Sequence, residues 1–418
     1  MKKVVAILLA LMMVMSLSMT ALAEEKTIVV NLTAMQDSQK KVLDNGIAMW
    51  EEANPGFKAD LQWGMDTSDW GQYTSQLLTK FAAGEQMDTT YCAVEGVAFL
   101  ADNGAVVPLD DYIAADPELS AWYADISPEI LKCMMWEGKI YGMPYGWNPA
   151  IICYNKDMFA AAGIEVDNAT WNVEQFLDAA KKLTTEDCWG FVIGYALSQY
   201  QCMLSGNNTY TMNEDWTESW WANEKTIETF QLIYDMIKVH KVTPMVEASI
   251  DARALFTSGQ AAMYITGAWD VTTLNNSGIN WGFLDIPMGS DMIKGTSYGA
   301  DFYMLSSTCE NPEETLELML TLTGPEQQAF IAANSSSVPS TKTAAYSDVF
   351  LSQGDGMQLL YDGVLNYPNA RVICSPTFLP ETQEEFYIQW ADCLAENISV
   401  AEFCQNMHDF TVDCIANQ

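Results

Sequence analysis

Short β-branched runs alternate with amphipathic helices along this chain, and this alternation limits the fold more than any other feature. The expected order is a strand at 28–32 (IVVNL), a helix with Val42, Leu43, Ile47 and Trp50 on one face, a strand at 57–63, a helix at 73–83 and a strand near 89–94. Asn54-Pro55-Gly56 ends the first helix and Gly84 ends the second. Elements that alternate at this length predict an α/β fold with a mainly parallel sheet.

The same alternation restarts in the second half of the chain. A helix is predicted after Asn172, its expected N-cap, and one face of that helix carries Val173, Phe176, Leu177, Ala180 and Leu183. A strand is expected at 191–193, and a later helix between Asn311-Pro312 and Gly324-Pro325. The chain has 418 residues, and single hydrophobic cores stop growing at roughly 250–300 residues, so two lobes are expected.

The N-terminus has the pattern of a secretory signal peptide. Lys2 and Lys3 precede an apolar run at 4–15, and Ala21-Leu22-Ala23 supplies the small-x-small site at which signal peptidase cleaves. The run is too short to span a membrane, so residues 1–23 are expected to be removed. No cysteine follows the cleavage site for lipid attachment. The mature chain is therefore expected outside the cytoplasm, either periplasmic or secreted, and without an anchor.

The charge balance and the missing motifs argue against several classes of function. The chain has 55 acidic and 19 basic residues, a net charge of −36, and no cluster of Lys or Arg, so nucleic-acid binding is not expected. It contains no nucleophile elbow, phosphate-binding loop, zinc-protease motif or dinucleotide motif, and only two histidines could serve as general bases. We therefore expect a protein that is not an enzyme and needs no cofactor.

The ten cysteines are scattered, and their spacing does not define a disulfide framework. Disulfide bonds and free thiols in a reducing habitat both remain open. Cys404 and His408 have a spacing that some metal sites use, but the same spacing places them on one face of a helix. No metal site is expected.

Two aromatic rings and an amide precede an apolar run in the segment GMPYGWNPAIICYNKDMF at 142–159, where a core would favour aliphatic residues. The longer segment 138–184 resembles family-1 extracellular solute-binding proteins, the sugar-capturing components of ATP-binding-cassette importers. Three further segments resemble other parts of that family in the expected order: 77–113, 255–270 (LFTSGQAAMYITGAWD) and 299–331. Together these segments extend the resemblance over nearly all of the mature chain.

The resemblance implies a type II periplasmic-binding-protein fold, in which two lobes, each a mainly parallel sheet flanked by helices, are joined by hinge crossings. Lobe 1 is expected at 24–145 and 302–323, and lobe 2 at 146–301 and 324–418. Gly142, Gly146 and Gly299 lie in the crossings, where they are expected to let the lobes close over a ligand. The implied protein is a monomer that captures a sugar or oligosaccharide between its lobes and delivers it to the permease subunits.

Sugar recognition requires flat rings for the apolar C–H faces and fixed polar groups for the hydroxyls. Tyr145, Trp147 and Asn148, in the first crossing, are expected to face the cleft, with burial of Trp147 in the core as the alternative. The other expected ligand-binding residues are Trp63, Asp66, Glu95, Tyr195, Gln199, Trp269, Tyr298, Asp301 and Arg371. The alternatives are a solvated loop acid for Glu95 and a surface ion pair for Arg371. Trp216, Trp220 and Trp221 are expected to serve packing.

Two other functions stay open on the sequence. The same fold could hold another solute: a polyamine, which acids and rings such as Glu95, Asp301 and Trp269 would suit, or glycerol phosphate or iron. Phosphate would require Arg or Lys in the cleft, and iron would require a tyrosine cluster with basic residues, and neither is evident. A secreted polysaccharide-degrading enzyme is the alternative from a different class.

Overall fold

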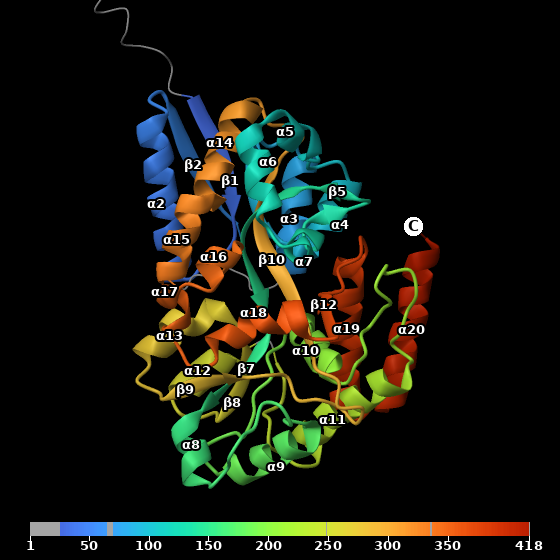
Figure 1. Cartoon of the computed structure of the whole chain (residues 1–418). Helices are drawn as coiled ribbons and strands as arrows, with labels where there is room; N and C mark the ends of the chain where they lie inside the picture. Colours follow the sequence, from blue (N-terminus) through green and yellow to red (C-terminus); the bar gives the residue numbers. More distant parts are fainter. Residues whose placement is uncertain (1–25, 65–69, 248, 335–336, 418) are drawn as a thin grey trace, which may run out of the picture.

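The computed structural model describes residues 26–64, 70–247, 249–334 and 337–417. The expected signal peptide at 1–23 and the candidate ligand-binding residue Asp66 lie outside these residues. Figure 1 shows two α/β lobes, lobe 1 at the top and lobe 2 at the bottom, with long strands running between them. Within the described residues, no helix is both long enough and apolar enough to cross a membrane.

Lobe 1 is built on a seven-stranded mixed sheet with the order β11-β6-β10-β3-β1-β2, in which β12 also pairs with β10. The strands are β1 (Lys26–Leu32), β2 (Phe57–Trp63), β3 (Thr89–Ala93), β6 (Gly142–Pro149), β10 (Gly295–Leu305), β11 (Val338–Pro339) and β12 (Asn369–Val372). β1 pairs in parallel with β2 and β3, as the early alternation predicts. β10 is antiparallel to both β3 and β6, so the crossing strands make the sheet mixed.

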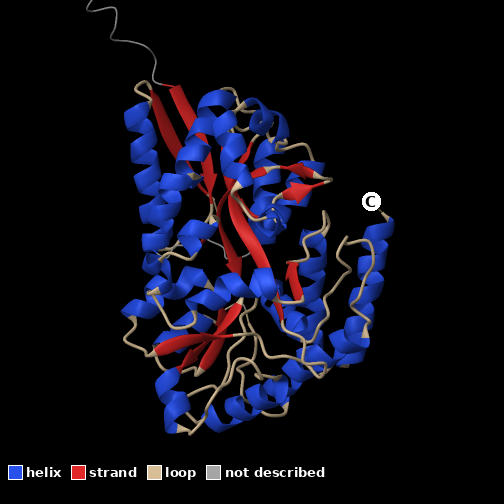
Figure 2. Cartoon of the chain, viewed as in Figure 1, coloured by secondary structure: helices blue, strands red, loops and turns tan. Residues whose placement is uncertain are grey.

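Helices cover both faces of this sheet, with α2, α14 and α15 on one side and α3 and α4 on the other (Figures 1 and 2). The helices of lobe 1 are α2 (Asp37–Ala53), α3 (Trp70–Ala82), α4 (Val94–Asp102), α5 (Asp110–Ala115), α6 (Pro117–Ala124), α7 (Pro128–Lys132), α14 (Pro312–Thr323) and α15 (Pro325–Asn334). A small hairpin joins β4 (Met135–Trp136) to β5 (Lys139–Ile140). The predicted apolar face of α2 is confirmed, because Val42, Leu43 and Trp50 are buried.

Lobe 2 has the expected α/β class, but its sheet differs from the expected parallel arrangement. The three strands are β7 (Ile151–Asn155), β8 (Met263–Thr266) and β9 (Trp281–Leu284), and β7 is antiparallel to both neighbours. The reason is that β7 carries the chain away from the first crossing, whereas β8 and β9 run back toward it. The lobe therefore places the ends of β8 and β9 near the crossings.

Residues 191–193, expected as a strand, form only an isolated parallel bridge from Val192 to Tyr264. The ladder stops on both sides because neighbouring backbone groups have other partners. Phe191 N–H donates to the Val242 carbonyl at 3.1 Å, and Gly194 N–H donates to the side chain of Gln199 at 2.5 Å. The segment is thus a buried extended stretch that is not a strand.

The remaining helices follow, of which the two short ones at 342–345 and 348–351 contact α15 of lobe 1. They are α8 (Lys156–Ala161), α9 (Val173–Leu183), α10 (Leu197–Gly206), α11 (Glu224–Lys238), α12 (Ala252–Thr257), η1 (Ala268–Asp270), α13 (Val271–Asn276), α16 (Lys342–Ala345), α17 (Asp348–Leu351), α18 (Met357–Asn366), α19 (Leu379–Leu394) and α20 (Val400–Ala416). The capping prediction for α9 is confirmed, because Asn172 Oδ1 accepts from Gln175 N–H at 3.0 Å.

All ten cysteines are free thiols, and seven of them are buried. Burial raises the pKa of buried thiols such as Cys92 and Cys153, so these side chains stay protonated and act as small apolar groups. Of the two readings left open by the sequence, the structure favours free thiols. Cys404 and His408 both lie in helix α20, as their spacing predicted.

The two long antiparallel strands β6 and β10 connect the lobes. β6 leads from lobe 1 into β7 of lobe 2, and β10 returns in the opposite direction. Their pairing shifts register between Asp301 and Phe302, which places an irregularity in the middle of the crossing. Ala150 N–H still donates to the Ser297 carbonyl at 3.0 Å, so the ladder continues to the edge of lobe 2. These strands are the structural candidates for a hinge.

The segment that follows the expected boundary at residue 324 packs on lobe 1. Gln327 of α15 donates to the Val42 carbonyl at 2.6 Å and accepts from Asn45 of α2 at 3.0 Å. β11 then pairs with β6. Gly324-Pro325 breaks the helix but returns the chain along the same lobe, since Gln328 N–H donates back to the Gly324 carbonyl at 2.9 Å. We propose that lobe 1 includes 302–339 and that lobe 2 resumes after that segment.

Candidate functional site

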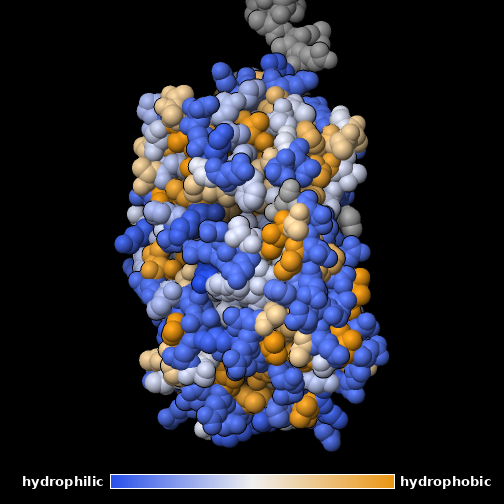
Figure 3. Space-filling view, turned by 90° about the vertical axis from the view of Figure 1, so that its right-hand side faces the viewer, coloured by the Kyte–Doolittle hydropathy of each residue, from blue (hydrophilic) through white to orange (hydrophobic). Residues whose placement is uncertain are grey.

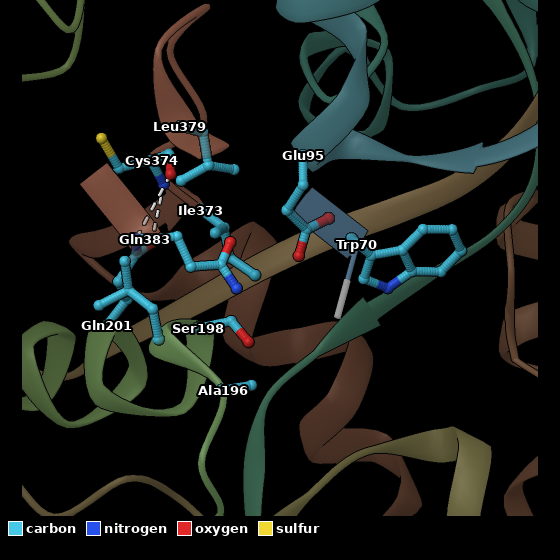
Figure 4. A pocket seen from close by; sticks show the side chains of 10 residues that line it. Trp70, Glu95, Ala196, Ser198, Gln201, Ile373, Cys374, Leu379 and Gln383 are labelled. Carbon is cyan, nitrogen blue, oxygen red and sulfur yellow. Dashed lines mark hydrogen bonds between the residues drawn. The ribbon is translucent and has the colours of Figure 1, made fainter. Parts of the chain in front are cut away.

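A cavity lies between the two lobes, beside the crossing strands (Figure 4). Lobe 1 contributes Trp70 and Glu95, and lobe 2 contributes Ala196, Leu197, Ser198, Gln201, Ile373, Cys374, Leu379 and Gln383. Its solvent-accessible volume is about 20 Å³. That volume holds little more than one water molecule. A solute of the size of a sugar therefore requires the lobes to separate before it can enter.

The wall from lobe 1 presents a ring and a carboxylate. Trp70 is the first residue of α3, and its ring packs against Tyr73 and Tyr91 with centroids 6.0 and 5.9 Å apart. Glu95 lies in the first turn of α4, directly after the carboxyl end of β3, the edge at which ligands bind in open α/β sheets. Figure 4 shows its carboxylate pointing across the cavity toward Ser198 and Gln383.

The wall from lobe 2 is made by the N-terminal ends of α10 and α19 and by the segment after β12. Gln201 is held in place by the backbone of Cys374, whose N–H donates to Gln201 Oε1 at 2.9 Å. Gln383 Nε2 donates to the Tyr387 hydroxyl at 2.7 Å, and the Tyr387 ring stacks on Tyr195 with centroids 4.2 Å apart. These contacts fix the polar side chains before any ligand arrives.

The predicted site residues divide into three groups, and the first lies at this cavity. Glu95 lines it, and Tyr195 and Gln199 flank the wall formed by residues 196–198. Tyr195 is half-buried under Tyr387, whereas Gln199 uses its side-chain oxygen to accept from Gly194 N–H. Ser198, Gln201 and Gln383 were not predicted, since nothing in their local sequence distinguishes them from other polar helix residues.

The second group lies in the interior, contrary to the expectation that it faces a cleft. Trp147 is 0% exposed, and its Nε1 donates to the Pro339 carbonyl at 3.1 Å. Its ring meets Tyr361 and Tyr298 edge to face, with centroids 5.0 and 6.4 Å apart. Tyr145 is buried against Tyr91. The physical reason is that β6 is an interior strand paired with β10 and β11 at its two edges, while α14 and α18 pack against it.

Asp301 and Tyr298 also belong to this interior group, and the half-buried Asn148 is hydrogen-bonded to it. Asn148 Nδ2 donates to Asp301 Oδ2 at 2.7 Å, and its carbonyl oxygen accepts from Ser337 at 3.2 Å. The Tyr298 hydroxyl donates to Glu129 of lobe 1 at 3.2 Å. Burial raises the pKa of Asp301 to about 7, against the opposing effect of the neighbouring Tyr91 hydroxyl and the Asn148 amide. The polar groups of the crossing thus bind one another across the two lobes.

Asp301 gives the protein a pH-dependent stability. The folded chain holds this proton more tightly than the unfolded chain, whose aspartates titrate near about 4. The stabilisation is therefore fully present below about pH 4 and is lost as the pH rises through about 7, by ~1.4 kcal/mol for each unit of pKa shift. Asp301→Asn removes the titration, so the stability of the variant relative to wild type should rise between pH 4 and pH 7.

Denaturant unfolding at the two pH values checks this expectation. Asp178→Asn, on the exposed face of α9, is the control and should show the same difference from wild type at both pH values. A stability difference for Asp301→Asn that does not change with pH would contradict the assignment.

The third group does not line the cavity. Trp63 is 46% exposed at the end of β2, with the Lys40 amine 5.8 Å from its ring. Trp269 is half-buried in η1, where its ring covers Gly267 so closely that a Cβ there would lie 2.1 Å from it. Arg371, at the end of β12, stacks between the rings of Tyr210 and Trp220 at 4.8 and 5.3 Å. The surface ion pair considered for Arg371 is not found among the described residues.

A stacked tryptophan pair joins the lobes near the cavity, and no local sequence pattern predicted it. Trp136 of β4 belongs to lobe 1, and Trp216 belongs to a turn of lobe 2 before α11. Their rings lie 6.4 Å apart at an angle of 17°. Trp216 has a φ of +56°, an uncommon conformation for a bulky residue that is often found at functional sites. Trp216 also packs beside Cys374, which lines the cavity.

If this pair holds the lobes together, its two rings should act as one unit in ligand binding. Trp136→Ala and Trp216→Ala are each expected to weaken ligand affinity several-fold, because aromatic pairs contribute about 0.5–1.5 kcal/mol beyond their buried area. The double variant should lose little more than either single variant, since the second ring has lost its partner. Titration calorimetry on the four proteins measures the coupling. Effects that simply add would show that the stack has no role in closure.

Comparisons with known proteins agree with this geometry. Residues 47–354 match the family described as bacterial extracellular solute-binding protein. A putative binding protein of Brucella abortus (strain 2308) is 26% identical over 318 residues, which are 73% of this chain and 74% of the relative. The galactooligosaccharide-binding protein of Bacillus subtilis (strain 168) is 25% identical over 239 residues, 54% of this chain and 55% of the relative.

Solved structures share the fold over nearly the whole chain. The ABC substrate-binding protein Lmo0181 of Listeria monocytogenes, in complex with cycloalternan, has a TM-score of 0.84 at 20% identity and covers 94% of this chain and 100% of its own. The maltose-bound MalE3 of T. maritima has a TM-score of 0.80 at 18% identity, covering 92% of this chain and 99% of its own. The two-lobed α/β architecture expected from the sequence is therefore confirmed.

Proposed function

Because this chain belongs to the bacterial extracellular solute-binding proteins, we propose that it captures a carbohydrate between its lobes and delivers it to the permease of an ATP-binding-cassette importer. One observation carries the proposal: a ring, a carboxylate, a hydroxyl and an amide converge on a single cavity from both lobes, at Trp70, Glu95, Ser198 and Gln383. The names of relatives support the ligand class, since one is a galactooligosaccharide-binding protein and a structural neighbour holds cycloalternan.

Each wall has a separate task in this mechanism. The Trp70 ring offers a flat apolar face to sugar C–H groups. The Glu95 carboxylate accepts hydrogen bonds from hydroxyls, and the Gln383 amide can donate to one hydroxyl while accepting from another. Because the tyrosine stack of Tyr195 and Tyr387 positions Gln383 in advance, little side-chain entropy is lost on binding.

Opening of the lobes gives the ligand access to the cavity, and closing of the lobes encloses it. In the arrangement of Figure 1, α3 of lobe 1 meets α19 of lobe 2 and the cavity is too small for a sugar, so the lobes separate about β6 and β10 to admit the ligand. They then close over the bound ligand without returning fully to that arrangement. The permease then recognises the closed form. We place the protein outside the cytoplasm, as a monomer, after removal of residues 1–23.

Binding without turnover is part of the proposal. A panel of mono- and oligosaccharides, with spermidine as a non-sugar probe, is added to residues 24–418, and melting temperature and released reducing ends are measured. At least one saccharide should raise the melting temperature and be recovered unchanged. Release of reducing ends would favour the enzyme, and a shift with spermidine but no saccharide would favour a polyamine carrier.

A further inference from the structure

Arg371 is a cation beside the cavity whose partners in the described residues are aromatic rings. It is one of two arginines in the chain. The other, Arg253, forms an ion pair with Asp270 at 3.1 Å. The guanidinium of Arg371 instead lies over Tyr210 and Trp220, 4.8 and 5.3 Å from their centroids. No carboxylate of the described residues lies within ion-pair distance of it.

The missing counter-charge is unusual in a chain with this composition. Because the chain has 55 acidic and only 19 basic residues, a carboxylate beside Arg371 would be expected. In addition, Nη1 of Arg371 is buried and has no hydrogen-bond partner among the described residues. Aromatic rings stabilise a cation through their faces, but they do not accept the in-plane N–H groups. A buried donor without an acceptor costs free energy, so the site is incomplete as it stands.

The position of Arg371 connects this incomplete site to the cavity. Ile373 and Cys374 follow it in the chain, and both line the cavity. Cys374 also packs with Met212 and Phe378 in the cluster that contains Trp216. The rings that hold Arg371 thus come from the same segment, 210–220, as the tryptophan that reaches across to lobe 1. A ligand that extends from the cavity toward this segment would approach the guanidinium.

We propose that the ligand is an anionic saccharide, whose acidic group pairs with Arg371 while its neutral hydroxyls face Glu95. This inference rests on the proposed carbohydrate-binding function and narrows its ligand class. A planar guanidinium held between two rings presents paired N–H groups that match a carboxylate or phosphate bidentately. The carboxylate of Glu95, on the lobe 1 wall, would repel a second acidic group on the part of the ligand that it faces. The negative charge of the ligand is therefore expected only at the end near Arg371.

Matched ligand pairs test the charge requirement on the wild-type protein. Calorimetric titrations compare glucuronic acid, and a disaccharide with a single terminal uronic acid, with their methyl esters, which lack the charge. Glucose 1-phosphate and inorganic phosphate are tested beside glucose to separate a carboxylate ligand from a phosphate ligand. At least one acid is expected to bind tenfold or more tightly than its neutral counterpart, and this preference should weaken as salt is added.

Variants then assign that preference to Arg371. Arg371→Gln should abolish it, and Arg371→Lys should restore part of it, because the ammonium keeps the charge but not the paired donors. Lys58→Gln, which removes an exposed charge on β2, is the control and should leave the preference unchanged. A melting curve of each variant establishes that it is folded.

Each outcome of these titrations is decisive. If neutral saccharides bind and every acid binds no more tightly than its ester, the inference is wrong while the proposed function stands. If an acid is preferred but Arg371→Gln keeps the full preference, another residue recognises the acidic group of the ligand and the inference is also wrong. If no saccharide binds at all, the proposed function fails, and the inference fails with it.

Discussion

Replacing Trp147 with alanine is expected to lower the free energy of unfolding by about 3–5 kcal/mol, the range found when a large aromatic side chain is removed from a core. The indole is fully buried between β10 and β11, and the variant loses its ring contacts to Tyr361 and Tyr298. The Pro339 carbonyl also loses its donor. Ligand affinity of the folded fraction should change little, because Trp147 does not line the cavity.

Denaturant unfolding without ligand measures the effect, and Trp63→Ala provides a matched control. Trp63 is 46% exposed, so its replacement should cost less than about 1 kcal/mol. If Trp147→Ala unfolds like wild type but loses ligand binding, then Trp147 is a cleft residue, as its sequence context suggested, and its placement in the core is wrong.

Glu95→Gln is expected to weaken affinity for the best-binding saccharide by about 10- to 100-fold. Hydrogen bonds to a charged group contribute about 1.5–3 kcal/mol, and glutamine replaces a carboxylate by a group that accepts less strongly at the same position. Stability should stay close to wild type, since the side chain is only partly buried at the cavity wall. Calorimetric titration gives the affinity directly.

The control for this variant is Glu85→Gln, an exposed change of the same charge on the same lobe. It should leave affinity unchanged. Equal affinities for wild type and Glu95→Gln would remove Glu95 from the site and would leave the lobe 1 wall with Trp70 alone.

The elements of the fold could be predicted well, because local patterns determine them. The β-branched run at 28–32 and the segment at 57–63 became strands with almost the expected bounds, and Asn172 caps α9 as its spacing with Gln175 indicated. Features that depend on contacts between segments far apart in the sequence could not be predicted in this way. We propose a lobe boundary other than 324, because a Gly-Pro break marks the end of a helix but does not show on which lobe the chain continues.

The site was predicted only in part, for a similar reason. Glu95 directly follows the carboxyl end of a strand, the edge at which ligands bind in open α/β sheets. Its position could therefore be predicted from the strand order, and it lies at the cavity. Trp147 was expected at the cleft because the family resemblance placed it in the first crossing and its ring would suit a sugar. Its strand instead pairs with β10 and β11, more than 140 residues away in the sequence, and the ring is buried. Gln383 and Ser198 depend on how two helices of lobe 2 face lobe 1, which no local pattern encodes.

Closure of the two lobes over a saccharide is tested most directly by small-angle X-ray scattering of residues 24–418 with and without a saturating ligand. The cavity in the closed arrangement has a volume of only about 20 Å³, so the unliganded protein must open to admit a sugar. We expect a larger radius of gyration for the unliganded protein than for the liganded protein, whose lobes close around the sugar. Figure 3 shows the face at which this opening would occur. Identical profiles at saturation would contradict the clamp mechanism and place the ligand elsewhere.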